Sequence, residues 1–393
     1  MPGAATRRVT MLVVVGAALA APLGAASLTP QERKEIGALA KQAVSPDVAT
    51  SEKGIEALKA YGEVAKPRLV SVLAQLLDRG RTVFIRARRL VKDPSKAKQL
   101  EEDLDKTRAE AAANVAKLQK GKPIQLAHEY YERLEPMFEL LGKVNEVRRG
   151  VYRVMKRRAG LFALWQELGG EDRRFTRAGE QALTADAVAI LGLSSEEVGK
   201  MPEFGRGTPP EKGTTAWHLW FDDACRRIEA YNATLSDRMS AGEAENIRTV
   251  NTYREMLGIL PLEADARLLQ SARRHSKEMV TLGYFSHTSP KPPNKTHTMR
   301  MKNAGYDRPY SENIAGGRAG GKGAFWMWFD SPGHHKNMAN AGSTAIGVGM
   351  WGSTWTQNFG RGKRLMLLEP DERKKAVVTG TIVPPGGRSS RRS

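Results

Sequence analysis

Through the N-terminal part of the chain, apolar positions recur at the spacing of α-helices. Thr29 followed by Pro30 predicts the first helix start, because threonine caps helices and proline is accepted at their first position. Two apolar stripes, at 55–64 and 69–76, predict two short helices joined near Pro67. The pair resembles one HEAT-type hairpin, but no second copy follows, so the pattern does not support a solenoid.

The next two segments are also helical in pattern. Residues 81–121 are rich in Ala, Glu, Lys, Leu and Arg, which predicts a long exposed or coiled helix. A further helical run covers 126–168, with an interruption expected at Ala159 and Gly160. Its basic amphipathic segment, 147–158, is interpreted as a solvated helix face, and contact with an anionic surface is the alternative.

The pattern changes after a linker at 203–213, which is marked by several glycines and prolines. A helix at 217–227 carries large aromatic side chains, and we expect it to pack on the domain that follows. Two more helices are predicted at 245–257 and 265–282. Gly283 stands where a helix C-terminal cap belongs.

Beyond these helices the hydrophobic period becomes two. Residues 346–350 and 355–359 alternate between apolar and small or polar side chains, and Gly352 lies in the turn between them. This pattern predicts a β-hairpin with one buried face. Helices followed by hairpin strands indicate an α+β domain.

Both ends of the chain differ from the folded part. Arg7 and Arg8 precede a short apolar run and small residues that end near Ala26, so residues 1–26 are interpreted as a secretory signal peptide. An uncleaved anchor is the alternative, and either interpretation places the protein in a secreted or periplasmic, extracytoplasmic location. The basic end, 369–393, is predicted to be disordered.

Composition limits the partners. The 393 residues carry a net charge of +19, which favours anionic surfaces such as lipid headgroups or envelope polysaccharide. Export makes nucleic acid the least expected partner, and a solvated basic surface without a specific partner is the alternative. The single cysteine, Cys225, excludes an intrachain disulfide and is expected to be a buried small apolar residue.

Residue types capable of chemistry are concentrated in the C-terminal third. Five of the seven histidines lie there: His275, His287, His297, His334 and His335. Histidine can titrate near neutral pH and bind metals, so this segment is the natural place for a functional site.

The order of short motifs in this segment resembles the CAP domain, also called the SCP-like or PR-1-like extracellular domain, in its bacterial form. The matching motifs, all between 246 and 360, are Asn251-x-x-Arg254, Gly283–His287, Gly305-Tyr306, Glu312–Ala315, Ser331–His334 and Ile346–Gly349. The predicted domain organisation is a signal peptide (1–26), a helical domain (27–205), a linker with a connecting helix (206–245), a CAP domain (246–368) and a basic tail (369–393).

The resemblance implies an α+β fold, with an α-β-α sandwich around a small antiparallel sheet following an all-helical domain. It also implies an open cleft with two histidines and two acidic residues. His287, Glu312 and His334 match three of these positions, and Asp330 is the candidate for the fourth, in a segment much shorter than the family's. Family members bind sterols, lipids or metals, and some have been proposed as proteases.

The chemical properties of these residues are compatible with binding of a cation. Pro332 predicts a helix start, so His334 falls in the first turn, where the helix dipole disfavours a charged imidazole. Two histidines and a carboxylate are a plausible set for zinc or another divalent cation. The alternative is that the residues only hydrogen-bond one another and fix the loops.

Three functions therefore remain open. The first is binding of a divalent metal, of a small apolar or cell-envelope ligand, or of both. The second is a metal-dependent hydrolase of envelope peptide or polysaccharide, with a cation on His287 and His334 and with Glu312 as general base. The third is a structural or adhesion module that acts through the basic helical surface and tail.

Three neighbouring features are given plain interpretations. His335 is expected at the surface, and His297 is expected to be exposed in its loop. The glycine-rich run 316–323 lacks the hydroxyl residue of a phosphate loop and is interpreted as a flexible rim of the cleft.

Overall fold

The computed structural model describes residues 28–119, 124–200, 208–317 and 320–367. The predicted signal peptide and basic tail lie outside the described residues. Within them the chain forms two compact units, the first from 28–78 with 160–171 and the second from 79–159 with 172–367. The domain boundaries predicted from the sequence stay a prediction.

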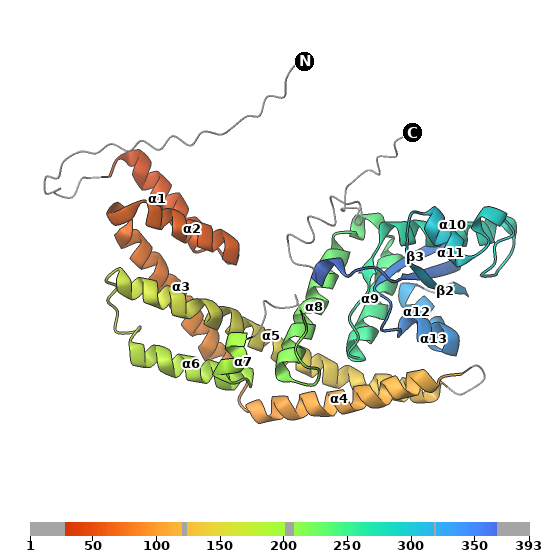
Figure 1. The fold of residues 1–393 in the computed structure, drawn as a ribbon, viewed down its shortest axis with the longest axis horizontal. Coiled ribbons are helices and arrows are strands. Elements are labelled where there is room, and N and C mark those ends of the chain that lie inside the picture. The colour runs from red at the N-terminus through yellow and green to blue at the C-terminus, as the bar shows by residue number, and fades with distance from the viewer. Residues whose placement is uncertain (1–27, 120–123, 201–207, 318–319, 368–393) are drawn as a thin grey trace, which may run out of the picture. The chain divides into compact units, whose positions relative to one another are not determined.

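Helices dominate the chain (Figure 1). The α-helices are α1 Pro30–Ala43, α2 Val48–Ala60, α3 Lys66–Leu90, α4 Pro94–Lys117, α5 Gln125–Glu167, α6 Arg177–Leu191, α7 Ser195–Lys200, α8 Thr215–Ala233, α9 Ala241–Met256, α10 Ala266–Leu282, α11 His297–Asn303, α12 Gly321–Phe329 and α13 Pro332–Met338. Short 3-10 turns are η1 Gly62–Val64, η2 Ser236–Arg238, η3 Pro292–Asn294 and η4 Leu365–Leu367. The strands are β1 Glu263–Ala264, β2 Pro309–Gly316, β3 Ala345–Trp351 and β4 Thr354–Gly360. Among the described residues, no helix combines the length and the apolar character that a membrane span requires.

The first unit begins as the sequence predicts. Thr29 caps α1, and its hydroxyl and backbone exchange hydrogen bonds with Glu32 in a capping box. Helix α2 packs closely on α1, because a Cβ atom at Gly54 would lie only 2.4 Å from the backbone nitrogen of Ala43. The predicted junction between two helices is confirmed, since α3 begins at Lys66 after the 3-10 turn η1.

Two predictions about the long helix α5 are wrong. The helix continues through Gly160 without interruption, and a single glycine costs a helix only about 1 kcal/mol relative to alanine. The basic segment is not a solvated face, because three of its arginines are buried in ion pairs. These pairs are Arg148 with Glu101, Arg149 with Asp222, and Arg158 with Glu180. Carboxylates from α4, α8 and α6 reach these arginines, so their charges are neutralised internally.

The second unit contains a four-stranded sheet with the order β1-β3-β4-β2. Strands β3 and β4 form the predicted hairpin, and β2 pairs antiparallel with β4. The short β1 pairs parallel with β3, so the sheet is mixed where the resemblance implied an antiparallel one. The fold is α+β, as expected.

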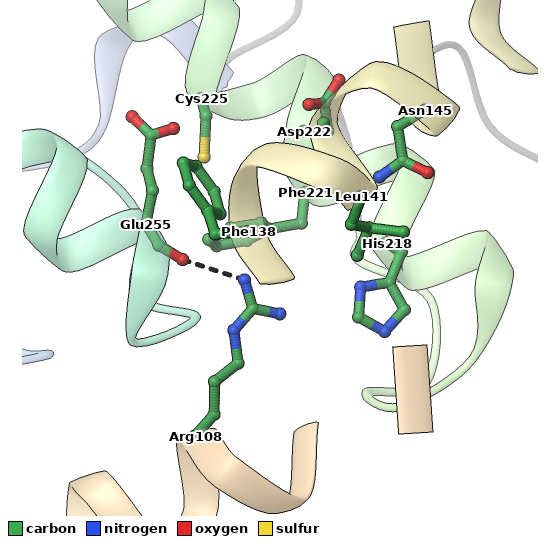
Figure 2. A pocket seen from close by; sticks show the side chains of 10 residues that line it. Arg108, Phe138, Leu141, Asn145, His218, Phe221, Asp222, Cys225 and Glu255 are labelled. Carbon is green, nitrogen blue, oxygen red and sulfur yellow. Dashed lines mark hydrogen bonds between the residues drawn. The ribbon is translucent and has the colours of Figure 1, made fainter. Parts of the chain in front are cut away.

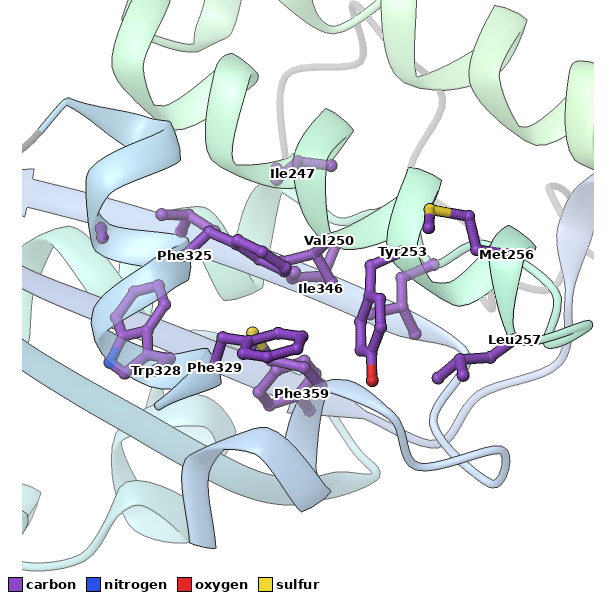
Figure 3. Close-up of a cluster of buried hydrophobic side chains, with 14 of the residues drawn as sticks. Ile247, Val250, Tyr253, Met256, Leu257, Phe325, Trp328, Phe329, Ile346 and Phe359 are labelled. Atoms are coloured by element: carbon purple, nitrogen blue, oxygen red, sulfur yellow. The ribbon is translucent and has the colours of Figure 1, made fainter. Parts of the chain in front are cut away.

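Helices cover both faces of the hairpin, so the prediction of one buried face is wrong. Gly347 and Gly349 face α10 so closely that a Cβ atom at either would lie 2.1 Å from that helix's backbone. Ile346 and Phe359 point to the opposite face, toward α9 and α12 (Figure 3). Val348, two positions along β3 from Ile346, is buried in the same cluster. The face of the hairpin that was predicted to meet solvent is covered by α10. Only glycine fits at 347 and 349 because the helix backbone lies so close.

The core on the α9 side also includes the helices that precede it in sequence. Leu104 of α4 and Leu134 and Leu141 of α5 belong to the same buried cluster as Phe325 and Ile346. The α+β domain therefore shares its hydrophobic core with part of the helical region that the sequence assigned to a separate domain.

Candidate functional site

The loop that carries His287 is held at several points. Helix α10 ends at Gly283, whose left-handed backbone (φ 67°) forms the predicted cap. The Tyr284 hydroxyl donates a 2.7 Å hydrogen bond to Glu278 Oε1, and the Ser289 hydroxyl donates to the same oxygen. His275 Nε2 lies 3.1 Å from the carbonyl oxygen of Ser286. The loop is consequently fixed on both sides of His287.

Glu312, on β2, lies beneath this loop with its side chain only 1% exposed. Its Oε1 is 3.0 Å from His287 Nδ1, and Arg300 Nη2 donates to both carboxylate oxygens at 2.7 and 2.8 Å. Burial raises the pKa of the Glu312 carboxyl, but the His287 hydrogen bond and the Arg300 charge outweigh it and leave that pKa below its ordinary value. The carboxylate is thus charged and fully engaged.

His334 comes from α13, which begins at Pro332 as predicted. Its ring centroid lies 6.3 Å from that of His287, with 51° between the planes. Burial, together with the nearby His287, lowers the pKa of His334 and keeps the ring neutral at neutral pH. The structure thus brings together His287, Glu312 and His334, and with Arg300 they are called the histidine site below.

Asp330 has a different partner. It follows the last residue of α12, and its Oδ1 lies 2.6 Å from Nε2 of His128 on α5. This contact ties the carboxylate to the helical region rather than to the histidine site.

The hydrogen bond to Glu312 determines how His287 can act. A carboxylate only accepts, so Nδ1 carries a proton and Nε2 is the ring nitrogen left to take a metal ion. The His287 side chain is 48% exposed, so the ring is open to solvent on part of its surface. A carboxylate behind a histidine is the usual support for a metal-binding imidazole. Among the described residues, no group of three or more His, Cys, Asp or Glu side chains is placed to hold a metal ion.

The sequence analysis missed the role of Arg300. It lies on α11, between the matched motifs, and also donates to the carbonyl oxygen of His287 at 3.0 Å. Because its partners come from separate segments, spacing alone gives no signal for it. His275 was noted only as one of the five histidines of this segment, yet it is buried beside Glu312, and burial lowers its pKa to about 4.

The structure contradicts the interpretations of His335 and His297 as exposed residues. His335 is not at the surface: it is buried, with Nδ1 2.8 Å from the carbonyl oxygen of Phe329 and Nε2 2.7 Å from the Tyr253 hydroxyl. His297 is half-buried, and its Nε2 lies 3.3 Å from the carbonyl oxygen of Tyr310.

The glycine-rich run is partly helical, since α12 begins at Gly321. A Cβ atom at Gly321 would lie 2.1 Å from the carbonyl oxygen of Gly242, so this glycine permits close contact between α12 and α9. Residues 318 and 319 of the run lie outside the described residues.

Cys225 is not a candidate nucleophile. It is buried as predicted, and burial raises its pKa well above the ordinary value, so the unreactive thiol persists. It lines a cavity of about 20 Å³ with Arg108, His218 and Glu255, in which Arg108 donates to the Glu255 carbonyl oxygen at 2.9 Å (Figure 2). Such a volume holds about one water molecule.

Comparison with known proteins identifies the C-terminal part of the chain. Residues 247–359 match the model of the CAP family, described as the cysteine-rich secretory protein family. The chain therefore contains a CAP domain in this region, as the motifs indicated.

Several bacterial proteins are similar to part of this chain. The uncharacterized protein YkwD of Bacillus subtilis (strain 168) is 36% identical over 135 residues, which are 33% of this chain and 52% of YkwD. The uncharacterized membrane protein YlbC of the same organism is 31% identical over 30% of this chain and 34% of its own length. The chain thus spans about half or less of these relatives. Among solved structures, an extracellular SCP-domain protein of Bacillus anthracis str. Ames is 32% identical over 30% of this chain and 40% of its own, with a TM-score of 0.29.

Proposed function

We propose that this protein is an extracytoplasmic binding protein whose CAP domain takes a divalent cation, zinc by preference, between His287 and His334. The observation that supports this most is the His287–Glu312 hydrogen bond, which occupies Nδ1 and leaves Nε2 of a half-exposed side chain as the nitrogen for a metal ion. His334 supplies a second imidazole nearby. With two protein ligands, the remaining positions of a tetrahedral cation are open to water or to a small apolar or envelope-derived ligand.

A hydrolytic role with Glu312 as general base is less well supported. A general base needs a free oxygen within reach of a water molecule. Both Glu312 oxygens accept from Arg300, and the side chain is almost completely buried. A low pKa further weakens it as a base. Binding without bond cleavage is the function that the geometry favours.

A role as a basic adhesion module is also weakened, because Arg148, Arg149 and Arg158 of the supposed basic surface are buried in ion pairs. The net charge of +19 still favours an anionic envelope surface as the setting in which the protein works.

Zinc titration calorimetry of residues 27–393 tests the proposal. We expect saturable binding near one equivalent that is lost in the His287→Ala/His334→Ala double variant. His297→Ala is the matched control, because this histidine hydrogen-bonds a backbone carbonyl and should leave the affinity unchanged. Asp330→Asn should also leave it unchanged, because Asp330 pairs with His128. Equal binding by the double variant and the parent protein would refute the site.

A further inference from the structure

Helices α8 and α9 enclose a second candidate site, a pocket of about 340 Å³. This volume lies within the range of small-molecule sites in proteins. The described residues that line the pocket include none from the histidine site. Any function of the pocket is therefore independent of the function proposed above.

The pocket carries two charges of opposite sign, one on each helix. Glu229 of α8 and Arg248 of α9 both line it, and both residues are exposed. In the part of the chain that the structure describes, Arg248 makes no ion pair with Glu229 or with another carboxylate. The positive charge of Arg248 is therefore available to a ligand.

Glu229 keeps its negative charge although a second acid contacts it. Burial raises the pKa of Glu255 well above its ordinary value, and its hydrogen bond with Glu229 acts in the same direction. Glu255 is consequently the protonated partner and donates to Glu229. A carboxylate has about four acceptor positions, so Glu229 can still accept from a ligand.

The two buried amides of the pocket are already engaged by the protein. Asn232 donates to the carbonyl oxygen of Leu262 at 2.9 Å and accepts from the backbone nitrogen of Ala264 at 2.7 Å. Asn251 donates to the same Leu262 carbonyl at 3.0 Å and accepts from the Leu262 nitrogen at 2.8 Å. These bonds tie both helices to the segment 262–264 and hold this part of the pocket in place. Recognition of a ligand is left mainly to the two charges and to the apolar residues.

The rest of the lining includes an apolar wall. Ile247 is buried and belongs to the main core, and Met239 is half-buried and packs against that core. Ala244 adds a small side chain to the lining. Methionine adapts its shape to different apolar groups, so this wall suits a compact hydrocarbon side chain.

We propose that the α8–α9 pocket binds a zwitterionic α-amino acid with an apolar side chain. The ammonium group pairs with Glu229, the carboxylate pairs with Arg248, and the side chain packs on the apolar wall. An anion on Arg248 would be repelled by Glu229, and a cation on Glu229 would be repelled by Arg248. A zwitterion satisfies both residues at once, and its apolar side chain gains free energy by leaving water.

Leucine is the probe for this site. In residues 27–393 with labelled methyl groups, leucine should shift the Ile247 and Met239 methyl signals saturably. Three analogues each lack one of its groups: 4-methylpentanoate lacks the ammonium, 3-methylbutylamine lacks the carboxylate, and glycine lacks the apolar side chain. Each should bind about fivefold more weakly than leucine or worse. Equal binding of any analogue would overturn the proposed recognition, and the absence of saturable shifts with leucine would overturn the site.

Charge variants should show a crossed pattern of affinities. Glu229→Gln should weaken leucine about fivefold, but 4-methylpentanoate should bind equally well or better, because it has no ammonium and is no longer repelled. Arg248→Gln should weaken leucine to a similar extent, but 3-methylbutylamine should bind equally well or better. A damaged fold would weaken every ligand. If either variant weakens all ligands equally, its charge does not contact the ligand and the proposal is wrong.

Three further variants complete the test. Glu139→Gln on α5 and Arg274→Gln on α10 remove exposed charges that do not line the pocket, so both should leave leucine binding unchanged. Ala244→Leu should abolish leucine binding by filling the pocket. Wild-type affinity for leucine in Ala244→Leu would place the ligand elsewhere and refute the site.

Discussion

Glu312 shows how the setting of one residue decides its role. The motif in which it lies predicted a ligand or a base, and the structure makes it the partner of Arg300 and the support of His287. Because Arg300 is itself buried, the two charges depend on each other. Removing either one leaves an uncompensated charge in the interior.

Glu312→Gln should therefore lower the free energy of unfolding by about 3–5 kcal/mol. Because the folded-state pKa of Glu312 lies below its ordinary value of 4.5, the contribution of the carboxylate is fully present above that value. It is lost as the pH falls through the folded-state pKa. Urea unfolding of both proteins from pH 7 downward measures this. Exposed Glu139→Gln is the control and should change stability by less than about 0.5 kcal/mol. Wild-type stability in the Glu312 variant would mean that the ion pair does not form.

His335 leads to a prediction about acid stability. Burial lowers its pKa to about 4 from an ordinary 6.5, so below pH 6.5 the unfolded chain binds a proton that the folded protein does not. Stability should then fall toward pH 4 with a slope of about 1.4 kcal/mol per pH unit for this residue. The buried His275 should contribute a similar slope. Urea unfolding at pH 7, 6 and 5 should show a shallower slope for His335→Asn, and an unchanged slope would contradict the assignment.

His287, Glu312 and His334 could be located from the sequence, because each lies in a distinctive short motif. The motifs could not locate Arg300, whose partners come from other segments of the chain. The burial of His335 was equally inaccessible, because it depends on Tyr253 of α9, more than eighty positions away. His334 and His335 are adjacent in sequence, yet the first belongs to the histidine site and the second to the core. Only the tertiary packing accounts for this difference.

At the scale of elements, the hairpin shows both the strength and the limit of pattern analysis. Alternation predicted β3 and β4, and their pairing is confirmed. The alternation also predicted that the small residues face solvent, whereas Gly347 and Gly349 lie where α10 approaches the sheet. Glycine alone does not distinguish a solvated face from a close backbone contact.

Gly347→Ala should test that contact. Its Cβ atom would lie 2.1 Å from the backbone of Leu268, so α10 must move away from the sheet. We expect destabilisation by about 2–3 kcal/mol, in the range of overpacked cores. Gly333→Ala, in α13, has no atom within 4 Å of the added carbon and should be neutral or stabilising. Thermal unfolding of the two variants gives the comparison, and equal melting temperatures would refute the close contact.

At the scale of the whole molecule, the main question is how far the CAP domain depends on the helices before it. The family match begins at residue 247, yet the core around Ile346 and Phe325 includes Leu134 of α5. The contact between His128 and Asp330 links the same helix to α12. The second unit should therefore unfold as one cooperative body that includes α5 up to residue 159.

Leu134→Ala separates this view from that of independent domains. Leu134 is fully buried, so its truncation should cost about 2–5 kcal/mol. If α5 and the sheet unfold together, Leu134→Ala should speed up amide hydrogen exchange in β4. The factor should be the one that corresponds to the lost free energy of unfolding. Leu140→Ala on the same helix is the matched control, because Leu140 is 53% exposed and its loss should leave the exchange nearly unchanged. If the β4 amides stay equally protected in Leu134→Ala while α5 exchanges faster, the helix unfolds separately from the sheet. In that case the CAP domain is stable without the buried contact, and the shared core contributes little to its stability.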